Sequence, residues 1–369
     1  MFLIARKNLF TEKTRFLISV LGVAVSVLLI TILLGLYLEW DKKFTSFLAS
    51  IPAELWLKQA GAGDIFHGRT LLPEDLRLEI EKIEGVKKVN KFLVTQIILK
   101  IEDKEEVLFL VGFDTENMIG RPLKIIEGKE IPNRGEIIID HSFSQKKNLK
   151  IGDKIYFQNR DFKIVGISKG GDFVISTAAF IRLEDLEELF GFQKFTNYFV
   201  IKIEKGFSAE NIRQKIEEKI PQIEAILTEK FIEDNRKFLS ESFLPVLYVL
   251  SLIGVLVGTA IVGLTIYTAT IEKLREFGIL KAIGMENFSL YQIVFIQSLI
   301  SSVSGFVVGI FLSYLTNFLA NQFVPAFTAS IEIFNLFFAF LAVLLMAIFA
   351  SWFPIKKIAG IDPASVFKA

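Results

Sequence analysis

The sequence has no cysteine and only two histidines, His67 and His141, among its 369 residues. The lack of cysteine excludes disulfides, thiolate nucleophiles and zinc sites built on thiolates. Two histidines leave little room for chemistry that depends on imidazole. The 42 basic and 41 acidic residues nearly cancel, so bulk charge does not attract a polyanion and we expect no nucleic-acid partner.

The sequence also lacks the motifs of nucleotide and metal sites. The phosphate-binding pattern Gly-x4-Gly-Lys-Ser/Thr does not occur. Asp140, His141 and Ser142 have the residue types of a catalytic triad, but adjacency in sequence does not form one, and a turn into a short helix is the simpler interpretation. Asp64 and His67 would supply only two metal ligands, which favours a solvated loop. We therefore expect no catalytic residue, metal or cofactor on this chain.

Four long apolar stretches dominate the sequence, in which hydrophobic residues make up 52%. A helix needs about 20 apolar residues to cross a bilayer. The stretches that meet this length without any charged residue are 16–38, 243–271, 289–317 and 333–355. Because charged residues inside a membrane usually mark an ion or proton path, their absence argues against an ion-driven transporter. The first stretch is too long for a cleavable signal peptide and has no small-residue cleavage site.

Taken together, the three segments 1–15, 272–286 and 356–369, which flank these stretches, carry ten basic and five acidic residues. Basic residues next to membrane spans favour the cytoplasmic side. The distribution therefore predicts a multi-pass protein of the cytoplasmic (inner) membrane with both termini inside. Residues 39–242 then lie outside, and residues 318–332 form a short external loop.

The external segment alternates between strand-like and helix-like patterns. The runs that we expect to be strands or helices in the outer parts of this segment are 53–57, 73–84, 92–101, 107–113, 198–203, 208–220 and 223–227. Their order predicts a ferredoxin-like module, over about 53–115 and 195–228. A β-rich module, about 120–193, is inserted into it. The expected fold class is thus a membrane domain of four transmembrane helices plus an α+β extracytoplasmic domain.

Residues 230–242 contain neither glycine nor proline. We expect them to form a stalk helix that continues into the span 243–271. A helix of about 40 residues is about 60 Å long, because each residue adds about 1.5 Å. Such a rod would carry displacement across the membrane.

Two pairs of glycines within the spans have the spacing of close helix contacts. Gly254 and Gly258 are four residues apart, as are Gly305 and Gly309. Small residues at this spacing let helix backbones approach closely. The pattern fits packing within the chain and a dimer contact equally well.

The segment between the second and third spans, 272–286, reads as a short amphipathic helix. Its charged residues come first, and Leu274, Phe277, Leu280 and Lys281 follow on roughly one face. Such a helix lies on membrane lipids or docks on a partner protein. The candidate contact residues are Glu272, Lys273, Leu274, Arg275, Glu276, Phe277, Leu280 and Lys281.

This segment resembles the signature "REfGiLrAiG" of the MacB/FtsX-like ABC transporter permeases. Further segments resemble the family in the same order, and together they cover essentially the whole chain. Ala5 to Leu9 with Arg15 is similar to the family's amphipathic N-terminal helix, which we expect over 1–15. The segments similar to its external core domain are Glu54 to Gln59 with Leu72-Pro73, Ile83 to Val89, and Leu149 to Ile155 with Phe162 to Ile167. Asp362 to Ala364, in the cytoplasmic tail 356–369, is similar to the family's tail.

The resemblance implies a homodimer of permeases served by two copies of a separate cytoplasmic ABC ATPase, which binds ATP and Mg²⁺. In this family the segment 272–286 would act as the coupling helix, and ATP hydrolysis would move the external domain by mechanotransmission to drive efflux. A periplasmic adaptor and an outer-membrane channel are further candidate partners. Because Met1 begins almost directly at the N-terminal helix, no fused ATPase is expected. The alternatives are an FtsX-like subunit that activates an external cell-wall hydrolase, and a lipoprotein-release permease.

The topology can be tested with single cysteines, since the chain has none of its own. We expect an impermeant thiol reagent to label Lys129→Cys in intact cells, because residue 129 lies in the external segment. Lys281→Cys should be labelled only after lysis. Labelling of Lys281→Cys but not of Lys129→Cys in intact cells would contradict the topology.

Overall fold

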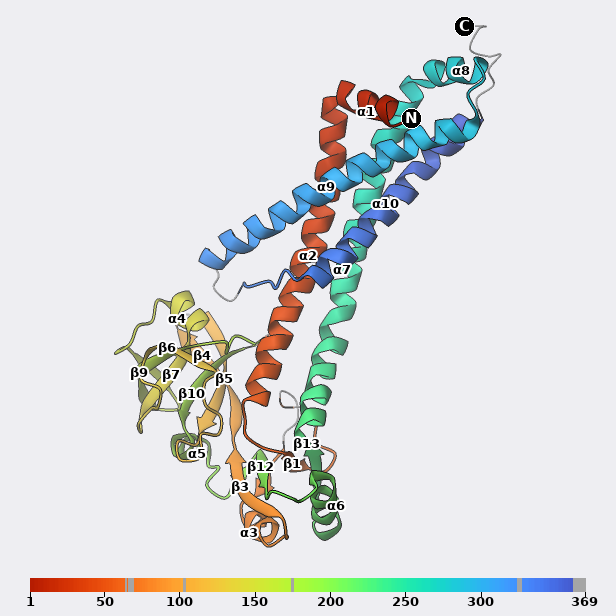
Figure 1. Cartoon of the computed structure of the whole chain (residues 1–369). Coiled ribbons are helices and arrows are strands. Elements are labelled where there is room, and N and C mark those ends of the chain that lie inside the picture. The colour runs from red at the N-terminus through yellow and green to blue at the C-terminus, as the bar shows by residue number, and fades with distance from the viewer. Residues whose placement is uncertain (64, 66–69, 102–103, 174–175, 324–326, 361–369) are drawn as a thin grey trace. The chain divides into compact units, whose positions relative to one another are not determined.

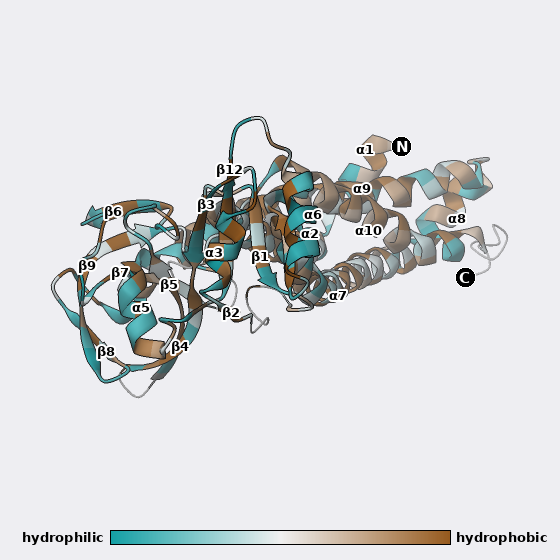
Figure 2. Cartoon of the chain, turned by 90° about the horizontal axis from the view of Figure 1, so that it is seen from below, coloured by the Kyte–Doolittle hydropathy of each residue, from teal (hydrophilic) through white to brown (hydrophobic). Residues whose placement is uncertain are grey.

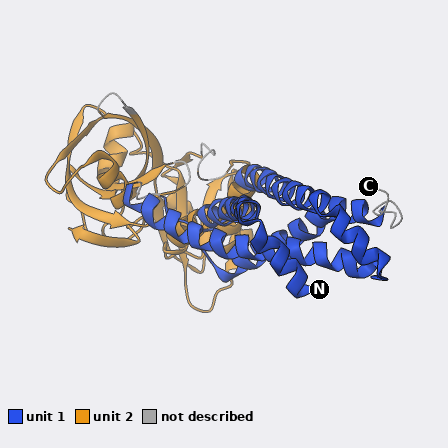
Figure 3. Cartoon of the chain, turned by 90° about the horizontal axis from the view of Figure 1, so that it is seen from above, with its two compact units in different colours: residues 1–38, 243–323, 327–369 blue, residues 39–242, 324–326 orange. Residues whose placement is uncertain are grey.

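The computed structural model describes residues 1–360 apart from 64, 66–69, 102–103, 174–175 and 324–326. The chain divides into two compact units (Figure 3). The first, here called the membrane unit, comprises Met1–Leu38, Phe243–Phe323 and the residues from Phe327 onward. The second, here called the mixed unit, is Glu39–Ser242 and contains every β-strand found among the described residues.

The membrane unit is helical (Figure 1). Its helices, two of which extend into the mixed unit, are α1 (Phe2–Thr11), α2 (Lys13–Ala49), α7 (Thr228–Glu272), α8 (Leu274–Ala282), α9 (Asn287–Phe323) and α10 (Ile333–Ala359). By length and composition, α2, α7, α9 and α10 can each cross a membrane. Figure 2 shows α9 and α10 mostly in the hydrophobic colour. The fold class predicted from the sequence, four membrane helices plus an α+β domain, is thus confirmed.

Several helices are longer than the spans expected from the sequence. Helix α9 continues to Phe323, so the first part of the expected loop 318–332 is helical, while Pro325 lies outside the described residues. Helix α10 runs through Pro354, and α7 runs through Pro245. A proline removes one backbone hydrogen bond, and within a membrane neighbouring groups satisfy the freed carbonyl without ending the helix.

The sequence predicted one helix over residues 1–15 and one over 272–286, but the structure divides each of these segments between two helices. Helix α1 stops at Thr11, and α2 begins at Lys13. Helix α7 stops at Glu272, and Lys273 is the residue that precedes α8. A break between consecutive helices therefore falls on a charged residue at each place.

The two glycine pairs pack within the chain. A Cβ on Gly305 would come within 2.5 Å of Val23, and one on Gly309 within 2.6 Å of Val27, both on α2. Gly254 and Gly258 face Ser26 of α2, whose hydroxyl donates a hydrogen bond to the carbonyl of Gly254 (2.5 Å). All four glycines are buried against α2. The structure thus uses the spacing of both pairs for packing within the chain.

The first sheet of the mixed unit has the ferredoxin-like strand order. Its strands, in spatial order, are β13 (Ile223–Leu227), β1 (Leu55–Gln59), β12 (Tyr198–Ile203) and β3 (Val86–Phe92), all antiparallel. Helices α3 (Leu76–Glu81) and α6 (Ala209–Lys219) contribute Ile80 and Ile212 to the core on one face of this sheet. A small ladder of β2 (Leu72–Pro73) and β11 (Phe195–Thr196) flanks it. We call this part the ferredoxin-like module.

The inserted module is a larger sheet that carries two short helices. Its strands are β4 (Val94–Ile101), β5 (Lys104–Phe113), β10 (Thr177–Arg182), β7 (Glu136–Asp140), β9 (Arg160–Lys169) and β6 (Lys124–Gly128) in spatial order, with β8 (Lys154–Phe157) also on β9. The helices are α4 (His141–Lys147) and α5 (Leu183–Phe190). Phe143 of α4 and Leu186 of α5 are buried in its core.

The boundary between the modules differs from the one expected at about residues 115–120. Strands β4 and β5 belong to the inserted module, because β5 pairs in parallel with β10 of the larger sheet. The strand that completes the ferredoxin-like sheet is instead β3, which pairs with β12. Alternation of apolar residues identifies strands but not the sheet that each one joins.

Within the mixed unit, the end of α2 packs on the inserted module. Phe44 and Phe47 of α2 contact Phe173, with ring centroids 5.4 and 5.6 Å apart. Lys43 forms an ion pair of 2.7 Å with Asp172. Burial raises the pKa of the Asp172 carboxyl, although Lys43 acts in the opposite direction.

The start of α7 packs on the ferredoxin-like module. The ring of Phe231 stacks on Trp56 of β1 with centroids 4.2 Å apart. The hydroxyl of Thr228 donates a hydrogen bond of 2.7 Å to the carbonyl of Ala53. Arg236 of α7 forms an ion pair of 2.9 Å with Asp41 of α2. The two long helices therefore contact different modules and are joined to each other by this ion pair.

Candidate functional site

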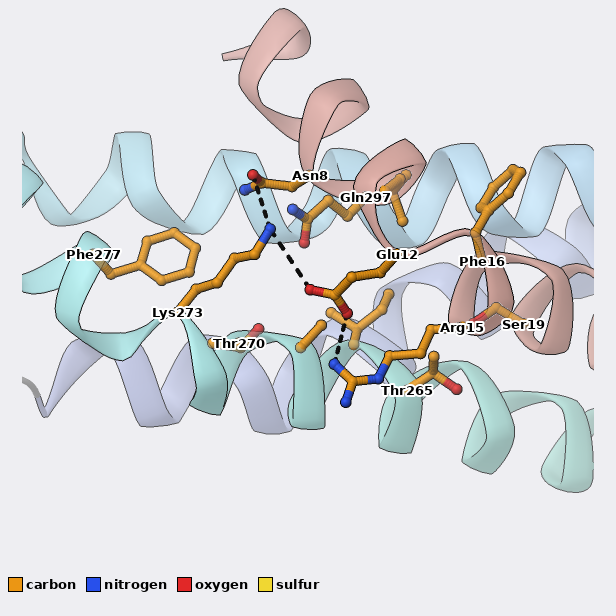
Figure 4. A pocket seen from close by; sticks show the side chains of 13 residues that line it. Asn8, Glu12, Arg15, Phe16, Ser19, Thr265, Thr270, Lys273, Phe277 and Gln297 are labelled. Atoms are coloured by element: carbon orange, nitrogen blue, oxygen red, sulfur yellow. Dashed lines mark hydrogen bonds and ion pairs between the residues drawn. The ribbon is translucent and has the colours of Figure 1, made fainter.

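The breaks α1–α2 and α7–α8 lie beside each other at one end of the membrane unit, around a small pocket (Figure 4). The side chains that line it are Asn8, Leu9, Glu12, Arg15, Phe16, Ser19, Thr265, Ile266, Ala269, Thr270, Lys273, Phe277 and Gln297. Its volume is about 30 Å³, which is room for little more than one water molecule. The pocket is therefore a packed polar junction between helices rather than a substrate site.

Two basic and two acidic side chains join the helices at this junction. The guanidinium of Arg15 donates to both carboxylate oxygens of Glu272, at 2.7 and 2.5 Å. It also donates to Glu12 at 2.6 Å. Lys273 donates to the side-chain oxygen of Asn8 at 3.1 Å and lies 3.6 Å from Glu12. We call these five residues the junction cluster.

The geometry of the junction cluster makes it an orienting device. A guanidinium that meets a carboxylate through two parallel hydrogen bonds fixes direction as well as distance. Single exposed ion pairs contribute little to stability, whereas connected ones restrain one another. Here Arg15 and Glu272 are separated by 257 positions in the chain. The cluster thus ties the start of α2 and the end of α1 to the end of α7.

One face of α8 is anchored on the membrane unit. Phe277 is buried in the same core cluster as Leu290 and Val294 of α9, and Leu280 packs against that cluster. Lys281 donates a hydrogen bond to the carbonyl of Ala359 at the end of α10. Helix α8 is thereby held by α9 and α10 in addition to the junction cluster.

The opposite face of α8 is exposed. It carries Arg275, Glu276, Ile279 and Ala282, and Ile283 directly after the helix continues the same face. Ile279 is 42% exposed and Ile283 is 75% exposed. Apolar side chains bordered by charges are typical of a protein-binding surface. We call these five residues the outer face of α8.

The structure separates the eight contact residues expected from the sequence into two groups. Arg275 and Glu276 lie on the outer face. The other six contact the chain itself. They are Glu272 and Lys273 in the junction cluster, Phe277 and Leu280 at the core, Lys281 hydrogen-bonded to α10, and the half-buried Leu274. Sequence reasoning missed Ile279 and Ile283. Their i, i+4 spacing, on the side away from Phe277, was the signal that would have found them.

The remaining candidates from the sequence have structural roles or lie outside the described residues. Asp140 accepts hydrogen bonds from the backbone N–H and the hydroxyl of Ser142, so it caps α4. This arrangement uses Asp140 for the helix start and supports the turn interpretation. Asp64, His67 and the tail segment at Asp362 fall outside the described residues.

Comparison with known proteins identifies the family. The family described as MacB-like periplasmic core domain matches residues 16–219, which is more than half of the chain. The family described as FtsX-like permease C-terminal matches residues 248–363, a range that includes α8, α9 and α10. This chain belongs to the MacB/FtsX-like ABC transporter permeases. It is therefore a membrane protein with a large extracytoplasmic domain, which is the mixed unit.

Individual relatives are distant. An uncharacterized ABC transporter permease of Methanocaldococcus jannaschii is 25% identical over 48% of this chain and 47% of its own length. A protein of Staphylococcus haemolyticus, provisionally named hemin transport system permease protein HrtB, is 26% identical over 65% of this chain and 66% of its own length. The macrolide export ATP-binding/permease protein MacB of Escherichia coli is 22% identical over 58% of this chain and 34% of its own length.

The alignments thus span between about a third and two thirds of these permeases. Among solved structures, the extracellular domain of the transporter YknZ from Gram-positive bacteria aligns with 47% of this chain and 98% of its own, with 13% identity and a TM-score of 0.36.

The junction cluster can be tested by reversing its charges. Arg15→Glu or Glu272→Arg alone should speed amide hydrogen exchange in the first turns of α2 (residues 13–20) several-fold, because like charges then face each other where the bidentate pair was. The double variant should largely restore protection, since the pair re-forms with its polarity exchanged. Hydrogen–deuterium exchange of the purified chain measures this.

Arg6→Glu is the matched control, because it reverses a charge on the exposed side of α1. It should leave exchange near that of the unaltered chain. Unchanged exchange in both single variants of the Arg15–Glu272 pair would show that the pair does not hold the start of α2.

Proposed function

We propose that this chain is the permease subunit of an ABC transporter and that the outer face of α8 binds a separate cytoplasmic ATPase. The observation that carries this proposal is the asymmetry of α8. Its inner face is anchored by Phe277, while Ile279 and Ile283 stand exposed beside Arg275 and Glu276. A partner that covers this face gains apolar contact area together with charge complementarity.

The proposed topology places α1 and α8 in the cytoplasm. The basic residues close to α8 and at the end of α10 support this orientation, because positive charge favours the cytoplasmic side. ATP and Mg²⁺ would be bound by the ATPase, of which two copies would serve a dimer of this permease. A periplasmic adaptor and an outer-membrane channel would be additional partners of the external domain.

The proposed mechanism is mechanotransmission along α2 and α7. Movement of the ATPase would shift α8, and the junction cluster would pass this shift to α1, α2 and α7. Helix α7 is unbroken from Thr228 to Glu272, and Phe231 near its start stacks on the ferredoxin-like module. Helix α2 packs through Phe44 on the inserted module. Relative displacement of the two helices would thus change the geometry between the two modules.

We assign extrusion of a substrate as the task of this movement. The external domain has two modules and matches the MacB-like core over its ferredoxin-like and inserted parts. This organisation favours an export protein over a regulatory subunit with a smaller external domain. The spans carry no charged side chain, so a substrate handled by the external domain need not pass between the helices.

The first test concerns binding of the ATPase. Ile279→Asp combined with Ile283→Asp should reduce co-purification of the ATPase at least tenfold, because both changes bury charge in the proposed interface. Reversing Arg275 and Glu276 should leave the fold intact but uncouple ATP hydrolysis from export. Leu78→Asp is the control, since Leu78 is equally exposed but lies on α3 of the mixed unit.

Full recovery of the ATPase with the Ile279→Asp/Ile283→Asp variant would remove the outer face of α8 from the interface. If the variant with Arg275 and Glu276 reversed also recovers the ATPase fully and exports at the normal rate, α8 has no coupling role.

The second test concerns transmission through α7. Inserting Gly-Gly-Ser-Gly between Phe238 and Leu239 should abolish export, because a flexible segment interrupts the stiff helix. Assembly and ATP hydrolysis should persist, since the insertion lies about 34 residues before α8 along the chain. Export is measured with the complex reconstituted in vesicles.

The same four residues inserted between Gln158 and Asn159, in the tight turn from β8 to β9, provide the control. This insertion should leave export unchanged. A normal export rate with the Phe238–Leu239 insertion would mean that force does not travel through α7.

A further inference from the structure

A groove runs along the side of the membrane unit between α7 and α10. Its volume is about 490 Å³, and the residues that line it are Leu256, Thr259, Ala260, Gly263, Leu264, Tyr267, Phe349, Ala350 and Phe353. Only Thr259 and Tyr267 bring polar atoms, so the lining is apolar. The volume lies within the range of small-molecule binding sites.

The shape of the groove follows from small residues at its floor. A Cβ added to Gly263 would lie 3.4 Å from the carbonyl oxygen of Ala350, so α7 and α10 approach closely at this point. On either side of Ala350, the rings of Phe349 and Phe353 stand out, 61% and 71% exposed. The backbones therefore meet at the floor while large side chains form the walls.

The length of the groove corresponds to one leaflet of a bilayer. From Leu256 to Tyr267 the lining follows α7 for eleven residues, which is about 16 Å at about 1.5 Å per residue. The hydrocarbon core is about 30 Å thick, so each leaflet contributes about 15 Å. An acyl chain is the ligand whose length and polarity fit such a groove in this surrounding.

The end of the groove nearest α8 is positively charged. Lys356 and Lys357 are exposed and follow Phe353 by about one helical turn on α10. The ammonium group of Lys356 lies 5.2 Å from the centre of the Trp352 ring, which holds it at the height where aromatic side chains meet lipid headgroups. The carboxylate that ends α7, Glu272, is already paired with Arg15.

From this combination we infer a binding site for one anionic glycerophospholipid. Its acyl chain lies in the groove between α7 and α10, and its phosphate lies at Lys356 and Lys357. The charge of the lysines, the apolar lining and the length of one leaflet select this ligand over a neutral lipid or a soluble anion. The site does not depend on the ATPase, and it rests on the proposed function only for the topology, which sets the leaflet of the lipid.

A lipid at this place would act on α7. It would fill the space between α7 and α10 beside their closest contact and so restrain movement of one helix against the other. Anionic lipid is a component of the cytoplasmic leaflet, which is the leaflet at α8 in the proposed topology.

The experiment is a lipid titration of the delipidated full chain in detergent, read by native mass spectrometry. One phosphatidylglycerol per chain should bind about 25-fold more tightly than phosphatidylcholine, because each of the two lysines raises the affinity for an anionic lipid about fivefold. Lys356→Gln combined with Lys357→Gln should reduce this preference to near unity. Ala260→Phe should weaken binding of both lipids at least tenfold, because Ala260 is exposed in the groove and its ring would occupy the place of the acyl chain.

Arg6→Gln combined with Lys7→Gln is the matched control, since it removes two exposed basic side chains from α1 without touching the groove. It should keep the preference for phosphatidylglycerol. Glycerol 1-phosphate, which has the headgroup chemistry but no acyl chain, should not displace the lipid at equal concentration.

Several results would overturn the site. Equal binding of the two lipids, a preference that survives the loss of both lysines, or unchanged binding to Ala260→Phe would each do so. Displacement by glycerol 1-phosphate would indicate a simple anion site instead. A shift of the monomer–dimer ratio by Ala260→Phe without any change in lipid binding would show that a second copy of the chain covers the groove.

Discussion

The structure depends on one constraint, which is that backbone polar groups inside a lipid bilayer must find partners within the chain. Four segments meet it as unbroken helices, and they remain helical even at Pro245 and Pro354. Because the helical hydrogen bonds do not stop where the apolar residues stop, α2 and α7 continue into the mixed unit. Within the lipid this requirement keeps the helices continuous, and beyond it α7 continues because residues 230–242 contain neither glycine nor proline.

The two ends of α7 are held by different kinds of interaction. Near its start, Phe231 is fixed by aromatic stacking on Trp56, which is strong because the contact is buried. At its end, Glu272 is fixed by two hydrogen bonds from the guanidinium of Arg15, which set both direction and distance. One attachment is therefore apolar and buried, whereas the other is an ion pair that is partly exposed.

The long helices divide the mixed unit between them. Helix α2 contacts the inserted module through Phe44 and the Lys43–Asp172 ion pair, and α7 contacts the ferredoxin-like module. Burial raises the pKa of Asp172, so removing Lys43 would leave that carboxyl without the charge that favours its ionised form. The Asp41–Arg236 pair joins the two helices.

The sequence alone determined the four spans, the length of α7 and the family resemblance of residues 272–284. These features depend on local composition: apolar length, missing charges, and the absence of glycine and proline from 230–242. Only the tertiary structure decided that β4 and β5 join the larger sheet, that Gly305 and Gly309 pack on α2, and that Phe277 points inward while Ile279 points outward. Local periodicity sets the type of an element, but its partner depends on residues distant in sequence, as with Arg15 and Glu272.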